Sequence, residues 1–236
     1  MRRPTVDFHT HILPEVDDGS KSLEMSLQML REEQKAGIKT VVATPHFYPN
    51  ADLYEEFQER RKNALEKLKS AAESEKLPEI ILGAEVFYSE GIENWDILPE
   101  LAIEGTKFIL IEIPHTGFTE RHLKGLSRFE EKTGYTPIVA HLDRYMKFFN
   151  THRLPERLAE MELLVQVNAS YFLDFPDRLQ AFRLLKQDKI HLLGSDCHNV
   201  TFRSPNLNLA YDIIEQKLGK ETISKFTEYE DLVFGR

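Results

Sequence analysis

Cysteine, long apolar runs and clustered positive charge are all scarce in this sequence, and each scarcity excludes something. Cys197 is the one cysteine, so an intrachain disulfide is excluded and a reducing compartment suits the chain. No run of about 18 apolar residues exists, and Arg2 and Arg3 lead into a charged stretch instead of a signal-peptide core, so we expect a cytoplasmic protein without membrane insertion. The formal net charge of -9 argues against a nucleic-acid partner, because phosphate backbones are bound by grouped lysines and arginines.

Seven apolar, β-rich runs bounded by turn signals are spread along the 236 residues. They cover residues 5–11, 40–46, 80–87, 108–114, 137–143, 163–170 and 190–198. Helical patterns lie between them, including 22–37, where Ser22 is expected to cap the helix and Gly37 to end it. Further helices are predicted at 53–75, 154–161 and 175–187. Strands that alternate with helices form parallel βαβ units, so residues 1–236 are predicted to be a single α/β domain, either an open doubly wound sheet or a closed barrel.

Side chains of the kinds that bind metals follow the carboxyl ends of six of these seven runs. They are His9, His11, His46, Glu85, Glu112, His141, Asp196 and His198. An open sheet binds ligands at one crevice fed by two or three strand ends, whereas a barrel brings every carboxyl end to one face. The distribution therefore favours a barrel.

The spacing of these side chains indicates what they bind. His9 and His11 are two residues apart on a strand, so they leave the same face and can chelate one ion, and Asp196 and His198 repeat this spacing. Imidazoles and carboxylates without a thiolate cluster favour Mn, Fe or Zn, and buried acids at a barrel mouth need cations nearby. A multinuclear metal centre is therefore predicted. The remaining histidines are expected to be ordinary surface or satisfied imidazoles: His115, His122, His152 and His191.

Seven motifs, in order from residue 7 to residue 199, resemble one known family. They are DFHTHILPEVDDGSKS, ATPHFYP, GAEVF, IEIP, AHLDRY, QVNAS and SDCHN. Together they resemble the polymerase and histidinol phosphatase (PHP) superfamily and, within it, the bacterial manganese-dependent protein-tyrosine phosphatases of capsule and exopolysaccharide synthesis, the CpsB/CapC type. The resemblance implies a distorted (β/α)7 TIM-like barrel whose metal site lies at the C-terminal ends of the strands.

The resemblance also implies a site and a reaction. The implied metal ligands are His9, His11, Asp18, His46, Glu85, Glu112, His141, Asp196 and His198, with Asp17 a less certain candidate than Asp18. Arg144 and Arg203 match arginines that contact the substrate phosphate, a role that suits the bidentate guanidinium. The implied cofactors are three divalent ions, Mn with Fe or Zn as alternatives. The implied reaction is hydrolysis of phosphotyrosine by a metal-bound hydroxide, with an autophosphorylated bacterial tyrosine kinase of polysaccharide synthesis as the partner.

Alternative interpretations remain open at this point. CHNVTFRS, residues 197–204, matches the Cys-x5-Arg-Ser loop of cysteine-dependent phosphatases, but it lacks the glycine such a loop needs, and we expect Cys197 to be buried outside the barrel. A PHP-type histidinol-phosphate phosphatase would belong to the same superfamily and use the same kind of metal site. A metal-dependent amidohydrolase would carry a modified lysine where Glu112 stands, and a non-catalytic module would predict broken ligand sets. Four aromatic residues either flank a substrate ring or pack in the core: Phe47, Tyr48, Tyr145 and Phe172.

Overall fold

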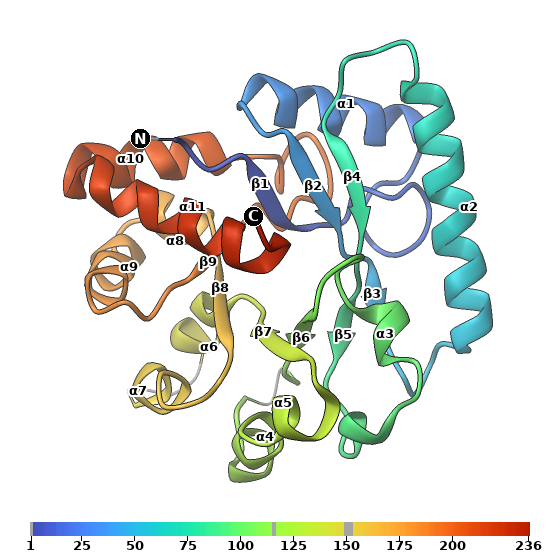
Figure 1. The fold of residues 1–236 in the computed structure, drawn as a ribbon. Coiled ribbons are helices and arrows are strands. Elements are labelled where there is room, and N and C mark those ends of the chain that lie inside the picture. Colours follow the sequence, from blue (N-terminus) through green and yellow to red (C-terminus); the bar gives the residue numbers. More distant parts are fainter. Residues whose placement is uncertain (1, 115–116, 149–152) are drawn as a thin grey trace.

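Parallel strands curl around a central axis, with helices outside them (Figure 1). The computed structural model of the protein describes residues 2–114, 117–148 and 153–236, so His115 and His152 lie outside the described residues. The strands are β1 (Val6–Thr10), β2 (Thr40–Ala43), β3 (His46–Phe47), β4 (Glu79–Leu82), β5 (Glu85–Phe87), β6 (Phe108–Glu112), β7 (Thr136–Val139), β8 (Leu164–Asn168) and β9 (Leu192–Gly194). They form two sheets, in the orders β1-β2-β4 and β3-β5-β6-β7-β8-β9, and all pairs are parallel.

The seven runs predicted as strands occupy seven successive positions around a ring of parallel strands. Two of the runs are interrupted, because Thr44 and Pro45 separate β2 from β3, and Gly83 and Ala84 separate β4 from β5. The ring closes between β1 and the residues after β9, where the His11 amide donates to the Cys197 carbonyl at 3.0 Å. The predicted distorted, TIM-like barrel is therefore confirmed.

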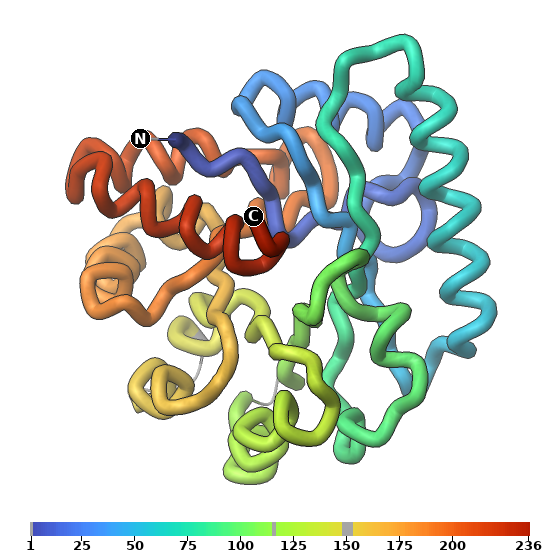
Figure 2. Tube along the Cα trace, viewed as in Figure 1, coloured from blue at the N-terminus to red at the C-terminus, as the bar shows by residue number. Residues whose placement is uncertain are grey.

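Helices cover the outside of the ring (Figures 1 and 2). The helices are α1 (Leu23–Lys35), α2 (Tyr54–Ala72), η1 (Ile92–Asn94), α3 (Leu98–Leu101), α4 (Glu120–Leu126), α5 (Phe129–Thr133), α6 (Leu142–Phe148), α7 (Leu154–Leu158), α8 (Ser170–Leu173), α9 (Asp177–Lys186), α10 (Leu207–Leu218) and α11 (Lys220–Phe234). Ser22 caps α1 by accepting from the Met25 amide, and Gly37 follows its end with φ of 86°, as the sequence predicts. In the described part of the chain, no helix combines the length and the apolar run of a membrane span.

The interior of the ring is apolar at the amino ends of the strands and polar at their carboxyl ends. Phe8, Leu110 and Ile138 belong to an interior cluster that also includes Val233 of α11. The ring of Phe8 stacks on Phe234 with centroids 5.9 Å apart, so the C-terminal helix closes the amino end of the barrel. The polar side chains of the candidate site lie at the opposite, carboxyl end of the ring.

Candidate metal centre

Two histidines of the first strand form the centre of the site. His9 lies on β1 and His11 just beyond it, both are fully buried, and their Nε2 atoms are 3.1 Å apart. Glu85 Oε2 lies 3.1 Å from His9 Nε2 and 3.2 Å from His11 Nε2. Asp196 Oδ1 lies within 3.6 Å of the same two nitrogens. Two imidazoles and two carboxylates thus converge on one point.

The other ring nitrogen of each histidine is already engaged. Asp17 Oδ2 lies 2.6 Å from His11 Nδ1, and Gln166 Oε1 lies 3.3 Å from His9 Nδ1. Because these oxygens only accept, a proton belongs on each Nδ1, and the two Nε2 atoms are the nitrogens directed at the convergence point. Burial lowers the pKa of His11, but the carboxylates of Asp17 and Glu85 outweigh it and raise the pKa to about 10. The arrangement therefore demands positive charge at the convergence point.

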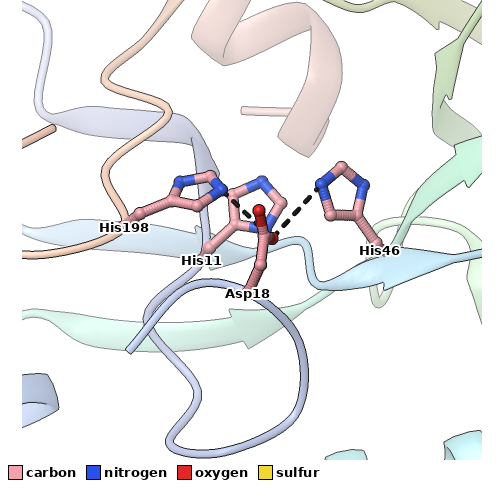
Figure 3. Close-up of side chains that lie close together, drawn as sticks. All are labelled: His11, Asp18, His46 and His198. Carbon is pink, nitrogen blue, oxygen red and sulfur yellow. Dashed lines mark ion pairs between the residues drawn. The ribbon is translucent and has the colours of Figure 1, made fainter. Parts of the chain in front are cut away.

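A second group lies toward the site mouth, where His11, Asp18, His46 and His198 meet (Figure 3). Asp18 Oδ1 is 3.4 Å from His198 Nε2 and 3.6 Å from His46 Nε2. The adjacent His198 imidazole lowers the pKa of Asp18 to about 2, and the charges of His46 and His11 add to that effect. A cation between these four groups would meet three nitrogens and a carboxylate.

The two neighbouring aspartates occupy different places. The Asp17 carboxylate accepts from the Gly19 amide at 2.9 Å and the His46 amide at 3.0 Å, in addition to its contact with His11. Those bonds use its oxygens to fix the loop, whereas Asp18 points at imidazole nitrogens. The geometry therefore favours Asp18 over Asp17 as a ligand.

A third group contains the acids of β5 and β6. His46, Glu85 and Glu112 converge, with His46 Nδ1 3.1 Å from Glu85 Oε2 and 3.8 Å from Glu112 Oε2. His141 Nε2 lies 2.7 Å from Glu85 Oε1 and 3.4 Å from Glu112 Oε1. Burial lowers the pKa of His141, but both carboxylates outweigh it and raise the pKa to about 9. Glu85 contacts residues of every group, so it is placed to bridge cations.

Buried nitrogen atoms without hydrogen bonds in the described part of the chain are further evidence that these side chains bind divalent cations. His46 Nδ1 and His198 Nε2 are buried and make no hydrogen bond with any other described residue, although a carboxylate oxygen lies within 3.4 Å of each. Buried polar atoms are normally hydrogen-bonded, and unpaired ones need an explanation. Cations bound by nitrogen and oxygen donors supply it.

Two arginines lie beside these groups. Arg144 donates to Asp196 Oδ2, and Arg203 lies 2.6 Å from Asp196 Oδ1. Both guanidiniums keep part of their surface exposed, and both line a cavity of about 260 Å³ next to the metal-ligand candidates. A phosphate that enters this cavity would meet two bidentate donors.

The strand without a ligand candidate carries residues that the sequence did not single out. On β8, Gln166 Oε1 accepts from the His141 amide at 2.7 Å, and Gln166 Nε2 donates to Asn168 Oδ1 at 3.0 Å. Asn168 Nδ2 in turn donates to Asp196 Oδ2 at 2.9 Å. These buried amides contact ligand candidates on β1, after β7 and after β9. The available signal is QVNAS, where polar residues alternate with apolar ones in a strand buried throughout.

One expectation about backbone geometry is wrong. Strand β9 ends at Gly194, so Asp196 and His198 do not project from one face of a strand. Asp196 has φ of 53° and His141 has φ of 34°, in a region that few residues other than glycine occupy. These turns direct the two side chains into the site, and such strain is typical of functional positions.

The cysteine and three of the four aromatic candidates are buried. Cys197 is fully buried, and burial raises the pKa of its thiol well above the usual value, which opposes a nucleophilic role. Phe47, Phe172 and Tyr145 are buried core residues, and the Tyr145 hydroxyl donates to the Ile113 carbonyl at 3.0 Å. Tyr48 differs, since it is 37% exposed and stacks on His46 with centroids 5.1 Å apart.

The two remaining described histidines have structural partners. His122 completes the N-terminal capping box of α4 with Thr119, and His191 Nδ1 accepts from the Val165 amide at 2.8 Å. Both satisfy backbone groups outside the site, as expected from the sequence.

Comparison with known proteins identifies relatives over nearly the whole chain. A model of the family described as "Capsular polysaccharide synthesis, CpsB/CapC" matches residues 5–230. The tyrosine-protein phosphatase CpsB of Streptococcus pneumoniae is 32% identical over 226 residues, which cover 91% of each chain. A solved structure described as "YwqE from Bacillus subtilis and CpsB from Streptococcus pneumoniae, unique metal-dependent tyrosine phosphatases" superposes with a TM-score of 0.87, 27% identity and coverage of 98% of this chain and 94% of that one.

A more distant structure shares the fold. The histidinol phosphate phosphatase of Lactococcus lactis superposes with a TM-score of 0.59 at 18% identity, over 92% of this chain and 93% of that one. At this identity the likeness concerns the barrel and carries no assignment of substrate.

Proposed function

Because the chain belongs to the CpsB/CapC family of capsular polysaccharide synthesis, we propose that it is a protein-tyrosine phosphatase that depends on divalent metal ions. The observation that carries this proposal is the convergence of three groups of metal-binding side chains next to two arginines. The relatives named as tyrosine-protein phosphatases support the substrate class, and the related structure described as metal-dependent supports the cofactor class.

The proposed ligand set is the nine residues that converge at the barrel mouth: His9, His11, Asp18, His46, Glu85, Glu112, His141, Asp196 and His198. They would hold three divalent ions, of which Mn is the first choice and Fe or Zn the alternatives, because imidazole and carboxylate donors suit all three metals. Glu85 is assigned the bridging role.

The reaction assigns distinct tasks to the chain's own residues. When bound, divalent ions act as Lewis acids on phosphoryl oxygens and lower the pKa of water. Arg144 and Arg203 hold the phosphate by bidentate hydrogen bonds and neutralise its charge. The leaving phenolate is the conjugate base of a phenol with a pKa of about 10, so its departure needs less help than that of an alkoxide.

The setting of the reaction is part of the same proposal. The substrate would be a phosphotyrosine protein, specifically an autophosphorylated bacterial tyrosine kinase of polysaccharide synthesis, and the protein would act in the cytoplasm. Residues 1–236 are proposed to form one domain, in keeping with the family match over 5–230. Nucleic acid is not proposed as a partner.

The test uses Mn-supplemented protein. It compares three substrates and asks whether Cys197 is the nucleophile. Release of phosphate is measured from a phosphotyrosyl peptide, from a phosphoseryl peptide of the same sequence and from histidinol phosphate. We expect the phosphotyrosyl peptide to have the highest kcat/KM, and Cys197→Ser to leave that value unchanged. A preference for histidinol phosphate would refute the substrate, and inactivity of Cys197→Ser in a folded protein would refute the mechanism in favour of the cysteine loop.

A further inference from the structure

Phe202 is exposed to an unusual degree for a large apolar side chain. Its exposed fraction is 98%, the highest among the large hydrophobic residues in the described ranges. It immediately precedes Arg203, one of the two arginines beside the metal-ligand candidates. An aromatic residue displayed next to a functional arginine is a candidate contact for a ligand.

The loop that carries Phe202 is held in place by its own hydrogen bonds. Asn199 Oδ1 accepts from the Thr201 amide at 2.9 Å and from the Arg203 amide at 3.2 Å. The His198 amide donates to the Arg203 carbonyl at 2.9 Å, which ties the loop to the site. Phe202 is therefore presented by a fixed turn, and a ligand that packs on it need not order the loop first.

Phe202 also lines the cavity of about 260 Å³ that contains Arg144 and Arg203. The group esterified to a phosphate held by these arginines must lie in that cavity or leave through it. Tyr171 supplies a second aromatic wall. The cavity is smaller than the roughly 300 Å³ at which pockets begin to accept drug-sized ligands, so it suits one ring and its phosphate better than a folded peptide segment.

We propose that Phe202 packs against the phenyl ring of phosphotyrosine and so selects aryl phosphates over alkyl phosphates. This inference rests on the proposed phosphatase function and deepens it, because it names the residue that recognises the leaving group. The guanidiniums recognise the phosphate alone, which phosphoserine and phosphotyrosine share, whereas an exposed ring contacts only an ester group that is large and flat.

The test measures binding of two stable phosphonates to the Mn-loaded protein by calorimetry. Phenylphosphonate carries the ring, and methylphosphonate carries the same anionic head without it. We expect Phe202→Ala to weaken phenylphosphonate about 10-fold and to leave methylphosphonate unchanged, and Phe202→Tyr to bind both like the wild type. Since Phe202 is exposed, the thermal midpoint of the variants should equal that of the wild type.

Phe175 provides the matched control. It is 75% exposed on the neighbouring loop, yet it does not line the cavity, so Phe175→Ala should bind both phosphonates normally. Equal weakening of both phosphonates by Phe202→Ala, or no weakening of either, would overturn the assignment. Turnover of a phosphotyrosyl peptide by the wild type tests the proposed function separately: its absence sinks the phosphatase, whereas an unaltered phenylphosphonate affinity in Phe202→Ala sinks only the role of Phe202.

Discussion

Glu85 lies within 3.2 Å of a nitrogen on each of four histidines. Its Oε2 contacts His9, His11 and His46, and its Oε1 contacts His141. Burial alone would raise the pKa of this carboxyl, but the imidazoles outweigh it and hold the pKa well below the usual value. A single buried carboxylate with four nitrogen neighbours is more easily explained by shared cations than by salt bridges, which at most a few protonated histidines could form.

The ligand candidates could be predicted from the sequence because metal-binding side chains at strand ends are unusual. Gln166 and Asn168 could not, because a buried amide on a strand looks like any satisfied core polar residue until its partners are known. Their partners come from β1, β7 and the segment after β9, which only the closed ring brings together.

Gln166 should therefore control metal affinity without being a ligand. Gln166→Met removes the acceptor for the His141 backbone amide and for His9 Nδ1, so the His141 main chain and the His9 imidazole each lose an orienting contact. We expect Mn affinity, measured by calorimetric titration of the metal-free protein, to fall about 10- to 100-fold. Gln28→Met on the exposed face of α1 serves as the control. Wild-type affinity in a folded Gln166→Met protein would contradict this role.

Asp17 should raise the pKa of the His11 imidazole. Asp17→Asn removes the charge that raises the pKa of His11 while keeping an oxygen for the Gly19 amide. We expect the pKa of His11 in the metal-free protein, followed by NMR titration of the imidazole, to fall from about 10 toward its ordinary range. Lys21→Gln, on the same loop and exposed, should not change it. A His11 pKa that stays near 10 in Asp17→Asn would show that Glu85 alone sets it.

At the scale of elements, the predicted runs are longer than the strands. The run 190–198 contains a strand only at Leu192–Gly194, and the run 40–46 is interrupted at Pro45, which has no amide hydrogen to donate. The positive φ values that turn Asp196 and His141 into the site could not be predicted from residue type, because aspartate and histidine occur at strand ends for many reasons. The seven strand runs, their order and the helices at 22–37, 53–75, 154–161 and 175–187 were predictable. The residues at which each strand ends were not.

The packing of β9 against β1 depends on a residue without a side chain. A Cβ atom on Gly194 would lie 2.5 Å from His9 Cβ and 2.8 Å from Gln166 Nε2. Gly194→Ala should therefore displace β9 and lower the free energy of unfolding by about 1–3 kcal/mol or more, measured by urea denaturation. Gly83→Ala is the milder comparison, because its nearest contact is a Val42 methyl group at 3.2 Å. Equal losses in the two variants would contradict the close approach at Gly194.

For the whole molecule, the barrel interior is apolar at the amino ends of the strands and polar at their carboxyl ends, and the C-terminal helix covers the apolar end. Glu230 of α11 accepts from the Thr5 and Val6 amides at 2.7 and 2.8 Å, which attaches the helix to the start of β1 (Figure 2). Nothing in residues 221–236 indicates which end of the barrel this helix covers. Sealing the amino end leaves the carboxyl end as the place where polar groups meet.

Glu230 predicts a pH dependence of stability. Burial raises the pKa of Glu230 to about 7, so the folded protein binds a proton more tightly than the unfolded chain. Its contribution is fully present below the ordinary glutamate pKa and is lost as pH rises through about 7. We therefore expect the wild type to lose stability relative to Glu230→Gln between about pH 5 and pH 8, by about 3 kcal/mol at most.

The Glu230 experiment compares urea unfolding of both proteins across this pH range. Glu228→Gln, on the exposed face of the same helix, should follow the wild type at every pH. Parallel pH profiles for the wild type and Glu230→Gln would show that Arg2 and the two amides keep this carboxylate charged at neutral pH.

The most direct test of the account is restoration of activity by metal. Wild-type protein and Glu85→Gln are freed of metal with a chelator, and the initial rate of phosphate release from a phosphotyrosyl peptide is followed as Mn is added back. The account predicts that the wild type is inactive without metal and regains its rate on addition, whereas Glu85→Gln stays at least roughly 100-fold slower because the carboxylate proposed to bridge the cations is gone. Full activity of the chelated wild type, or equal recovery of Glu85→Gln, would contradict it.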